Sequence, residues 1–229
     1  MSNINDFVIK DSVLTEYNGS EQIVKIPDGV TSINDYAFDD CKSLTSVEIP
    51  NSVTSICKGA FSDCENLTSI KIPSSVTFIG DNAFDGCEGL TSIKIPNSVT
   101  SIGYNAFYNC KNLTIIEIPS SVTSIGDWAF EDCAGLTSVT LPNSVSSIGD
   151  GVFCDCEGLT SIELPNGVTS IGKDAFSCCE ALTSIVIPSS VTEIGNEAFW
   201  GCNNLVITTP NGSYAEGYAR ENGIKVNLI

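Results

Sequence analysis

Polar and apolar residues follow one another along this chain in a pattern that repeats every 23 residues. Each unit begins at a proline and reads approximately P-x-S-V-T-S-I-G-x-x-A-F-x-x-C-x-x-L-T-S-I-x-I. The prolines are Pro27, Pro50, Pro73, Pro96, Pro119, Pro142, Pro165, Pro188 and Pro210. A unit of this length cannot bury its own apolar face, so each unit must stack against the next. The pattern therefore predicts a solenoid.

The segment L-T-S-I-x-I of each unit has the alternation of a strand with one buried face. In the first unit we expect Leu44, Val47 and Ile49 to point inward, and Thr45 and Glu48 to point outward. Equivalent strands of successive units would pair in parallel, about 4.8 Å apart. The proline that follows lacks an N–H and ends the strand. The V-T-S-I segment has similar spacing and predicts a second short extended stretch.

The rest of each unit predicts a change of direction. A glycine follows the second extended stretch in six units, and we expect it to turn the chain. These glycines are Gly80, Gly103, Gly126, Gly149, Gly172 and Gly195. The segment x-x-A-F-x-x-C is too short for a regular helix, so it predicts one helical or 3₁₀ turn with Ala, Phe and Cys inward.

The two ends differ from the units, as expected for a solenoid whose bare terminal coils would expose core and strand edges. Residues 6–26 are predicted to form an N-terminal cap of one or two strands, with a turn at Asn18–Gly19. Residues 27–209 hold eight repeats. Residues 210–229 are predicted to form a C-terminal cap, in which a short helix begins at Ser213 and a final strand follows.

The repeat pattern resembles that of the BspA-like leucine-rich-repeat family of bacterial and protist surface proteins. L-T-x-Y-x-G at residues 14–19 and G-S-Y-A at residues 212–215 add to the resemblance, which covers nearly the whole chain. It implies a single repeat domain over residues 1–229. The expected fold is a leucine-rich-repeat solenoid: a right-handed α/β-type superhelix of mainly short parallel β-strands with single helical or 3₁₀ turns. The resemblance also implies a ligand-binding or adhesive role, secreted or at a cell surface, and carries over no catalytic residue.

The outward strand positions would form a concave parallel β-face. One column of this face is threonine in seven units, whereas the positions beside it vary. The varying positions are predicted to contact a partner: Glu48, Lys71, Lys94, Ile115, Glu117, Thr140, Glu163 and Val186. The alternative is that these side chains simply stack, since threonine and β-branched residues suit a pleated surface.

Charge and composition exclude several functions. The formal net charge is −18, from 28 acidic and 10 basic residues. Such a surface repels phosphate backbones and anionic lipid, so we expect no nucleic-acid partner. No apolar run is long enough to insert in a membrane. The absence of histidine removes the commonest general base and the Ser-His and Cys-His nucleophile pairs, so we predict that the chain is not an enzyme.

Eleven cysteines invite a disulfide or metal interpretation. Eight form a column between inward Phe and Leu positions and are predicted to be buried thiols that act as small hydrophobes. Cys57, Cys154 and Cys178 lie outside this column. Cys154 and Cys178 each stand near a column member, Cys156 and Cys179, in adjacent units, but the spacing matches no standard zinc pattern. The acidic residues of the turn segment are interpreted as a solvated face. We therefore expect no metal and no cofactor.

The sequence thus predicts a monomeric, non-catalytic module that binds a protein or glycan. A structural spacer or an idealised repeat scaffold without a ligand of its own is the alternative, favoured by the uniformity of the units. The opening residues lack the basic and apolar regions of a signal peptide, and many free thiols suit a reducing compartment. A cytoplasmic location therefore stays open beside the surface location that the resemblance implies.

Overall fold

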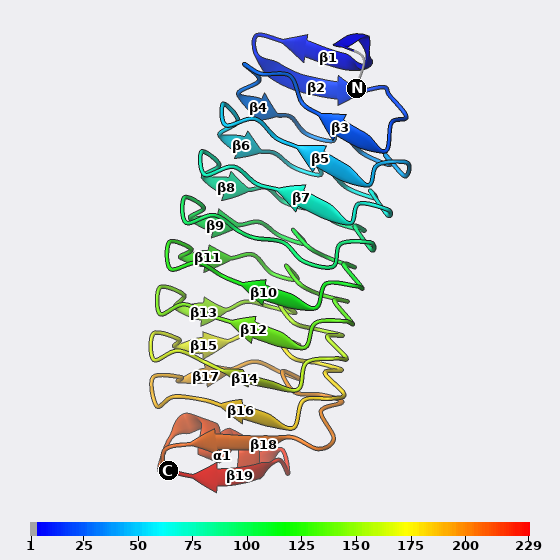
Figure 1. Cartoon of the computed structure of the whole chain (residues 1–229). Helices are drawn as coiled ribbons and strands as arrows, with labels where there is room; N and C mark the ends of the chain where they lie inside the picture. Colours follow the sequence, from blue (N-terminus) through cyan, green and yellow to red (C-terminus); the bar gives the residue numbers. More distant parts are fainter. Residues whose placement is uncertain (1–3) are drawn as a thin grey trace.

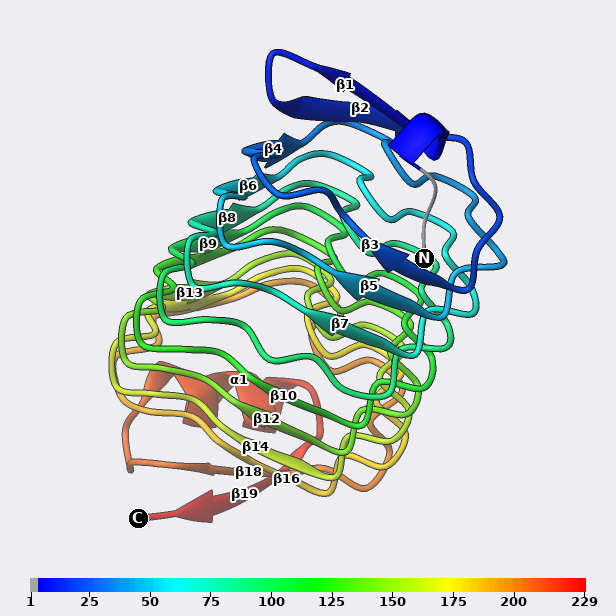
Figure 2. The same cartoon turned by 45° about the horizontal axis from the view of Figure 1, so that its top comes forward.

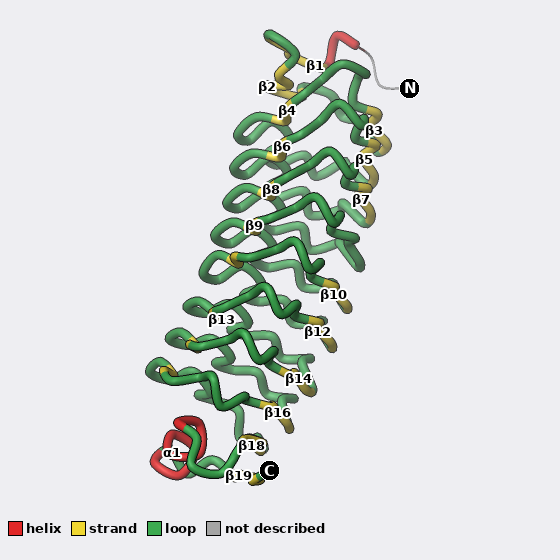
Figure 3. Tube along the Cα trace, turned by 90° about the vertical axis from the view of Figure 1, so that its left-hand side faces the viewer, coloured by secondary structure: helices red, strands yellow, loops and turns green. Residues whose placement is uncertain are grey.

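The computed structural model describes residues 4–229, which form a stack of coils with the chain termini at opposite ends (Figure 1). Each coil has a side made of turns and two short strands, except that in the coil around residues 92–94 the first strand is reduced to isolated bridges. Helix is confined to the two ends of the stack (Figure 3), in η1 (Ile4–Asp6) and α1 (Tyr214–Glu221). The leucine-rich-repeat solenoid predicted from the sequence is confirmed.

The L-T-S-I-x-I segments form the first strand column, whose members lie side by side in Figure 2. Its strands are β3 (Ile23–Lys25), β5 (Ser46–Glu48), β7 (Ser69–Lys71), β10 (Ile115–Glu117), β12 (Ser138–Thr140), β14 (Ser161–Glu163), β16 (Ser184–Val186), β18 (Val206–Thr209) and β19 (Lys225–Leu228). Ladder-paired neighbours are parallel and in register, so that Ser46 stands beside Ser69 and Ile185 beside Ile207. Because the register shift equals one repeat, every column of the sequence becomes a straight row on the molecule.

The V-T-S-I segments form the second strand column, as the spacing predicts. Its strands are β4 (Ser32–Ile33), β6 (Ser55–Ile56), β8 (Phe78–Ile79), β9 (Ser101–Ile102), β11 (Ser124–Ile125), β13 (Ser147–Ile148), β15 (Ser170–Ile171) and β17 (Glu193–Ile194). The isoleucine that closes each of these strands is buried. The two columns thus supply two walls of one continuous core.

The third side differs from the predicted helical or 3₁₀ turn: its segments are successive hydrogen-bonded turns. Two residues of each unit have positive φ, for example Tyr36 (57°) and Asp40 (55°) in the first unit, and a 3₁₀ or α-helix cannot contain them. The second of these positions is Asp, Asn or Gly in seven of its eight occurrences. These residue types tolerate the left-handed region best. They are Asp40, Asp63, Gly86, Asn109, Asp132, Asp155 and Gly201, and the eighth is Cys178.

The glycine column has a different role from the turn that was predicted. None of its six members has a positive φ. Instead, a Cβ built on Gly126 would lie 2.5 Å from the backbone carbon of Gly103 and from the backbone nitrogen of Tyr104. The glycines are therefore needed because the backbones of consecutive units approach closely at this corner.

The phenylalanine column forms a continuous stack inside the solenoid. From Phe38 to Phe199, neighbouring rings have centroids 5.0–5.7 Å apart and interplanar angles of 3–20°. Tyr17 extends the stack at one end and Tyr218 meets it edge-on at the other, at 6.1 Å. The caps thus cover the terminal rings of the aromatic stack.

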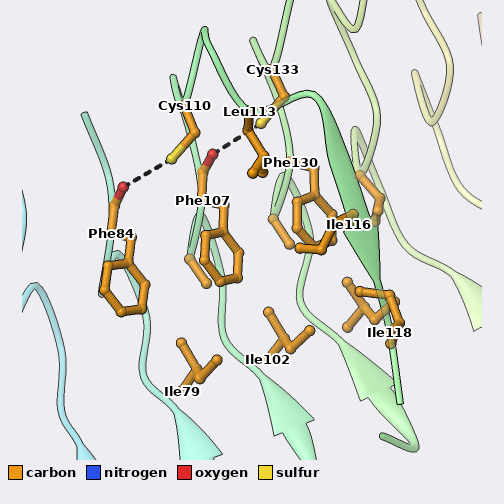
Figure 4. Close-up of a cluster of buried hydrophobic side chains, with 14 of the residues drawn as sticks. Ile79, Phe84, Ile102, Phe107, Cys110, Leu113, Ile116, Ile118, Phe130 and Cys133 are labelled. Carbon is orange, nitrogen blue, oxygen red and sulfur yellow. Dashed lines mark hydrogen bonds between the residues drawn. The ribbon is translucent and has the colours of Figure 1, made fainter. Parts of the chain in front are cut away.

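The cysteine column lies beside the phenylalanines and does more than fill space. Each thiol from the second unit onward donates a hydrogen bond of 3.0–3.3 Å to the phenylalanine carbonyl of the preceding unit. Figure 4 shows two of these bonds, from Cys110 to Phe84 and from Cys133 to Phe107. The Phe84 carbonyl also accepts the N–H of Cys87 in its own unit. The thiol therefore occupies the second acceptor site of a buried carbonyl.

The N-terminal end is closed by a hairpin. Strands β1 (Phe7–Lys10) and β2 (Val13–Tyr17) pair antiparallel, and β2 then pairs in parallel with β4. The hairpin turn is Asp11–Ser12, whose φ values of 49° and 63° suit a two-residue type I′ turn. The predicted turn at Asn18–Gly19 is therefore not the hairpin turn; these residues lie in the loop between β2 and β3.

The C-terminal end follows the prediction. The Ser213 hydroxyl caps α1 by accepting the N–H of Glu216, and β19 pairs in parallel with β18. Ala215 and Ala219 of the helix are fully buried against the last units. The helix and the added strand therefore take the place of a further repeat.

Candidate partner-binding face

Three rows of side chains point outward from the first strand column, and the threonine row is occupied by the fold itself. The Thr68 hydroxyl donates to the Thr45 carbonyl at 3.1 Å, and Thr137 donates to Thr114 in the same way. These exposed hydroxyls bridge one unit to the next. Stacking therefore accounts for the constancy of this row.

The residues predicted to contact a partner form the adjacent row and are displayed by the strands. Seven of the eight are exposed and Val186 is half-buried. Strand register places Glu48 beside Lys71, Glu117 beside Thr140, and Glu163 beside Val186. Ile115 belongs to the neighbouring outward row and is 59% exposed. The structure thus brings the predicted residues together on one face.

The row extends beyond the predicted residues at both ends. Lys25 in β3 stands beside Glu48, and Thr208 in β18 stands beside Val186. The signal for Lys25 was present, because I-V-K-I-P at residues 23–27 matches the strand and proline of the later units. We define the binding row as Lys25, Glu48, Lys71, Lys94, Glu117, Thr140, Glu163, Val186 and Thr208, with Ile115 at its side.

Two hollows open along this row where the strand ladder is interrupted. Between β7 and β10 the pairing is reduced to the isolated bridges Lys71–Lys94 and Ser92–Ile115. A hollow of about 480 Å³ lies there. It is lined by Ser92, Ile93, Lys94, Ile95, Asn97, Ile115, Glu117 and Pro119. This hollow interrupts an otherwise regular surface.

The second hollow lies where β12 and β14 belong to separate sheets, and its volume is about 320 Å³. Thr140 and Glu163 of the binding row line it, together with Asn143 and Pro165. Five of the eight predicted partner residues line one hollow or the other: Lys94, Ile115, Glu117, Thr140 and Glu163. Loops that follow the strands supply Asn97 and Asn143, which were not among the predicted partner residues.

Charge is distributed unevenly along the row. Lys25 forms an exposed ion pair with Glu48 at 3.1 Å. Lys71 and Lys94 stand side by side, and within the described part of the chain neither forms an ion pair. Two adjacent lysines on a chain of net charge −18 make this stretch a local cationic site.

The family model for the BspA type leucine-rich repeat region, which holds six copies of the repeat, matches residues 8–134 and again residues 77–206. The chain belongs to the BspA-type leucine-rich-repeat family. No curated protein matches it.

Solved structures agree with this membership. The leucine-rich repeat protein of T. pallidum is 29% identical, with a TM-score of 0.70, over 99% of this chain and 98% of that one. A leucine-rich repeat protein of Bacteroides ovatus is 31% identical, with a TM-score of 0.71, over 99% of this chain. This chain spans 64% of the Bacteroides protein. The BspA-type units seen here therefore stack in the manner of known bacterial repeat proteins.

Two aromatics of this BspA-type stack, the exposed Tyr36 and the half-buried Trp128, pack along its edge. Tyr36 and Trp128 occupy the first positive-φ position of their units, and each ring covers the glycine at the same position of the next unit. A Cβ on Gly59 or Gly151 would collide with these rings. Edge packing therefore accounts for Tyr36 and Trp128.

The cysteines outside the column separate from those inside it. Cys156 and Cys179 point inward and donate to Phe130 and Phe153. Cys154 lies on the turn side and donates to the Asp155 carboxylate at 3.2 Å. The column members Cys156 and Cys179 therefore bond to backbone carbonyls of the preceding unit, whereas Cys154 bonds to a carboxylate of its own turn.

The neighbourhood of Cys154 holds an unusual carboxyl group. Burial raises the pKa of Glu131 to about 7, and repulsion from Asp155, Asp132 and Asp174 adds to the effect. Burial also raises the pKa of the Cys154 thiol, helped by its hydrogen bond to Asp155.

Among the described residues, no helix has the length and apolar character to cross a membrane.

Proposed function

We propose that this chain is a non-catalytic binding module that holds a protein or glycan partner on the binding row. The observation that supports the proposal is the contrast between that row and its neighbours. Both rows are mostly exposed, but threonine hydroxyls donate hydrogen bonds to the preceding unit, whereas the binding row varies from unit to unit and borders two hollows. Rigid solenoids with extended faces commonly act as binding surfaces.

The charges narrow the chemistry of the partner. Lys71 and Lys94 favour a carboxylate-bearing group, and the exposed Ile115 beside the larger hollow favours an apolar group next to it. The acidic remainder of the surface repels nucleic acid and anionic lipid. We infer a partner segment that presents acidic and apolar groups together.

The proposal places the module at a cell surface or in secreted form, and membership in the BspA-type family is what supports this location. Proteolytic shaving of intact cells tests it. Loss of the protein from intact cells, with a cytoplasmic marker retained, is expected. Full protection of the protein under those conditions would exclude a surface location.

The binding proposal is tested with two variants of matched charge. The row variant changes Glu48, Lys71, Lys94, Glu117 and Glu163 together to Thr, the residue that the row itself carries at position 140. The control variant changes three glutamates and two lysines on the turn side: Lys42, Lys58, Glu65, Glu157 and Glu180. Both variants change the net charge by the same amount. A difference in partner binding between them therefore depends on where the changed residues lie and not on long-range electrostatics.

Binding of each form to a panel of purified extracellular proteins and glycans is measured by biolayer interferometry. We expect a saturable partner that the control variant binds like the natural chain and the row variant binds at least tenfold more weakly. An equal loss of affinity in both variants, or unchanged binding by the row variant, would show that the partner does not bind this face. A panel without any saturable partner would favour the spacer interpretation.

A further inference from the structure

One group of potential metal ligands exists within residues 4–229, and it lies on the turn side, away from the binding row. Donor atoms of Glu131, Cys154 and Asp155 all lie within 4.8 Å of one another. The Asp155 carboxylate also interacts with the thiol of Cys178.

The stacking of units assembles this group from three consecutive repeats. Glu131 and Cys154 occupy the same repeat position, as do Asp155 and Cys178 one residue later. Backbone hydrogen bonds fix the spacing, from the N–H of Asp132 to the Cys154 carbonyl at 2.9 Å and from that of Asp155 to the Ser177 carbonyl at 2.8 Å. The positions of the donors are therefore fixed by the fold, and only side-chain torsions remain to be adjusted.

The chemistry of the donors selects among cations. Ca²⁺ and Mg²⁺ prefer sites made of oxygen alone. Thiolates with carboxylates suit zinc and the similar ions cobalt and cadmium, with metal–ligand distances of about 2.0–2.3 Å for zinc. Because donors on a common ion lie closer than 4.8 Å, small rotations of Glu131 and Cys178, which are only partly buried, would complete the set.

We propose that Glu131, Cys154, Asp155 and Cys178 form a binding site for a zinc-class divalent cation that joins three consecutive repeats. In the metal-free site the Cys154 thiol donates to the Asp155 carboxylate and the Cys178 sulfur accepts from the Ser177 hydroxyl. Each thiol must lose its proton to become a ligand. Binding therefore releases one proton per thiol to solvent, together with the proton that Glu131 carries when it is neutral. The bound cation would replace these protons as the positive partner of the carboxylates.

Binding should strengthen as the pH rises, because protons compete with the cation for the same atoms. The groups that face Glu131 are Asp132, Asp155, Asp174, Cys154 and Tyr108, and all of them are acidic or neutral. Each of these groups favours the cation more when it is deprotonated. Enthalpies of binding measured in buffers of different ionisation enthalpy give the number of protons released.

The test uses the full chain in reduced form, with Zn²⁺ and Co²⁺ as probes. The natural chain should bind one equivalent of either ion, and Co²⁺ should produce a thiolate-to-cobalt charge-transfer band. The variants Cys154→Ser, Asp155→Asn and Glu131→Gln should each weaken binding at least tenfold, and Cys154→Ser should reduce the band. The first two replacements suit the fold, because Ser62 and Asn109 occupy the same positions in other units.

Matched controls separate this site from adventitious binding to an acidic surface. Cys57→Ser removes a thiol elsewhere, and Asp85→Asn removes a partly buried carboxylate at the repeat position of Glu131. Both controls should bind like the natural chain. The proposal is overturned if one equivalent of Zn²⁺ or Co²⁺ does not bind, if the band survives in Cys154→Ser combined with Cys178→Ser, or if Ca²⁺ competes as well as Zn²⁺.

Discussion

The phenylalanine column and the binding row are two rows of the same repeat, and they behave in opposite ways. Every unit has phenylalanine at the inward position, and seven of the eight side chains are fully buried in one ring stack. At the outward position the units carry glutamate, lysine, threonine or valine, mostly exposed. Packing in the core determines the residue type of the phenylalanine column, whereas no packing contact determines the residue type of the binding row. Variation along an otherwise uniform solenoid therefore indicates where a partner could be recognised.

The largest effect should come from breaking the ring stack. Phe107→Ala removes a fully buried ring that packs on Phe84 and Phe130 at 5.3 Å. We expect the free energy of unfolding to fall by about 3–5 kcal/mol and the two halves of the stack to lose cooperativity. Urea denaturation followed by circular dichroism measures both effects. As a control, Tyr104→Ala removes an exposed aromatic of the same unit and should change the free energy of unfolding little. An unchanged denaturation midpoint for Phe107→Ala would show that the ring stack does not stabilise the core.

The next effect tests the close approach at the glycine corner. Gly126→Ala places a methyl group 2.5 Å from backbone atoms of the preceding unit, so we expect a loss of about 1–3 kcal/mol. Gly217→Ala in α1 is the control, because its Cβ meets no atom within 4 Å. That replacement should stabilise the helix by up to about 1 kcal/mol. Equal melting temperatures for the two variants would show that the units do not stack this tightly.

The cysteine column gives a smaller effect. Cys110→Ala removes the thiol that donates to the Phe84 carbonyl at 3.3 Å. The carbonyl keeps the N–H of Cys87, so we expect a loss of only about 1 kcal/mol. Chemical denaturation of Cys110→Ala beside Cys57→Ala measures it, since Cys57 lies outside the column. If Cys57→Ala lowers the free energy of unfolding more than Cys110→Ala does, the thiol–carbonyl bonds do not stabilise the fold.

Glu131 should make stability depend on pH. Its pKa is raised from 4.5 to about 7 in the folded chain, so the folded state holds more protons than the unfolded state between these values. Stability contributed by this group is therefore present at low pH and declines as the pH rises from about 4.5 to 7. Because the group is partly exposed, solvent screening keeps the effect to about 1 kcal/mol or less. Melting curves of Glu131→Gln should lose this slope, and an identical pH profile in both proteins would assign it to other groups.

Much of this fold was predictable because the sequence repeats. A period of 23 residues with an alternating apolar segment determines which positions face inward, and it predicted both strand columns, the phenylalanine and cysteine columns, and the helix at Ser213. The predicted helical turn was wrong because residues such as Asp40 have a positive φ, which a right-handed helix cannot contain. The recurrence of Asp, Asn and Gly at that position was the signal that could have revealed it.

Other features depended on contacts between units that no single unit contains. The thiol–carbonyl bonds need the distance between two stacked turns, and the role of Gly126 needs the backbone of the preceding unit. The eight predicted partner residues lie on one face, but the hollows beside Lys94 and Thr140 arise from interruptions of the strand ladder that the regular period does not show. The proximity of Cys154 to Glu131 likewise required the stacked structure.

The most direct test of the contrast between the two rows is to compare stability and binding in the row variant. Changing Glu48, Lys71, Lys94, Glu117 and Glu163 together to Thr should leave the free energy of unfolding within about 0.5 kcal/mol per site, because exposed positions outside the packed interior carry little stability. Partner binding should fall at least tenfold in the same protein, while the turn-side control variant binds normally. A row variant that unfolds cooperatively at the natural midpoint but binds its partner unchanged would contradict the account.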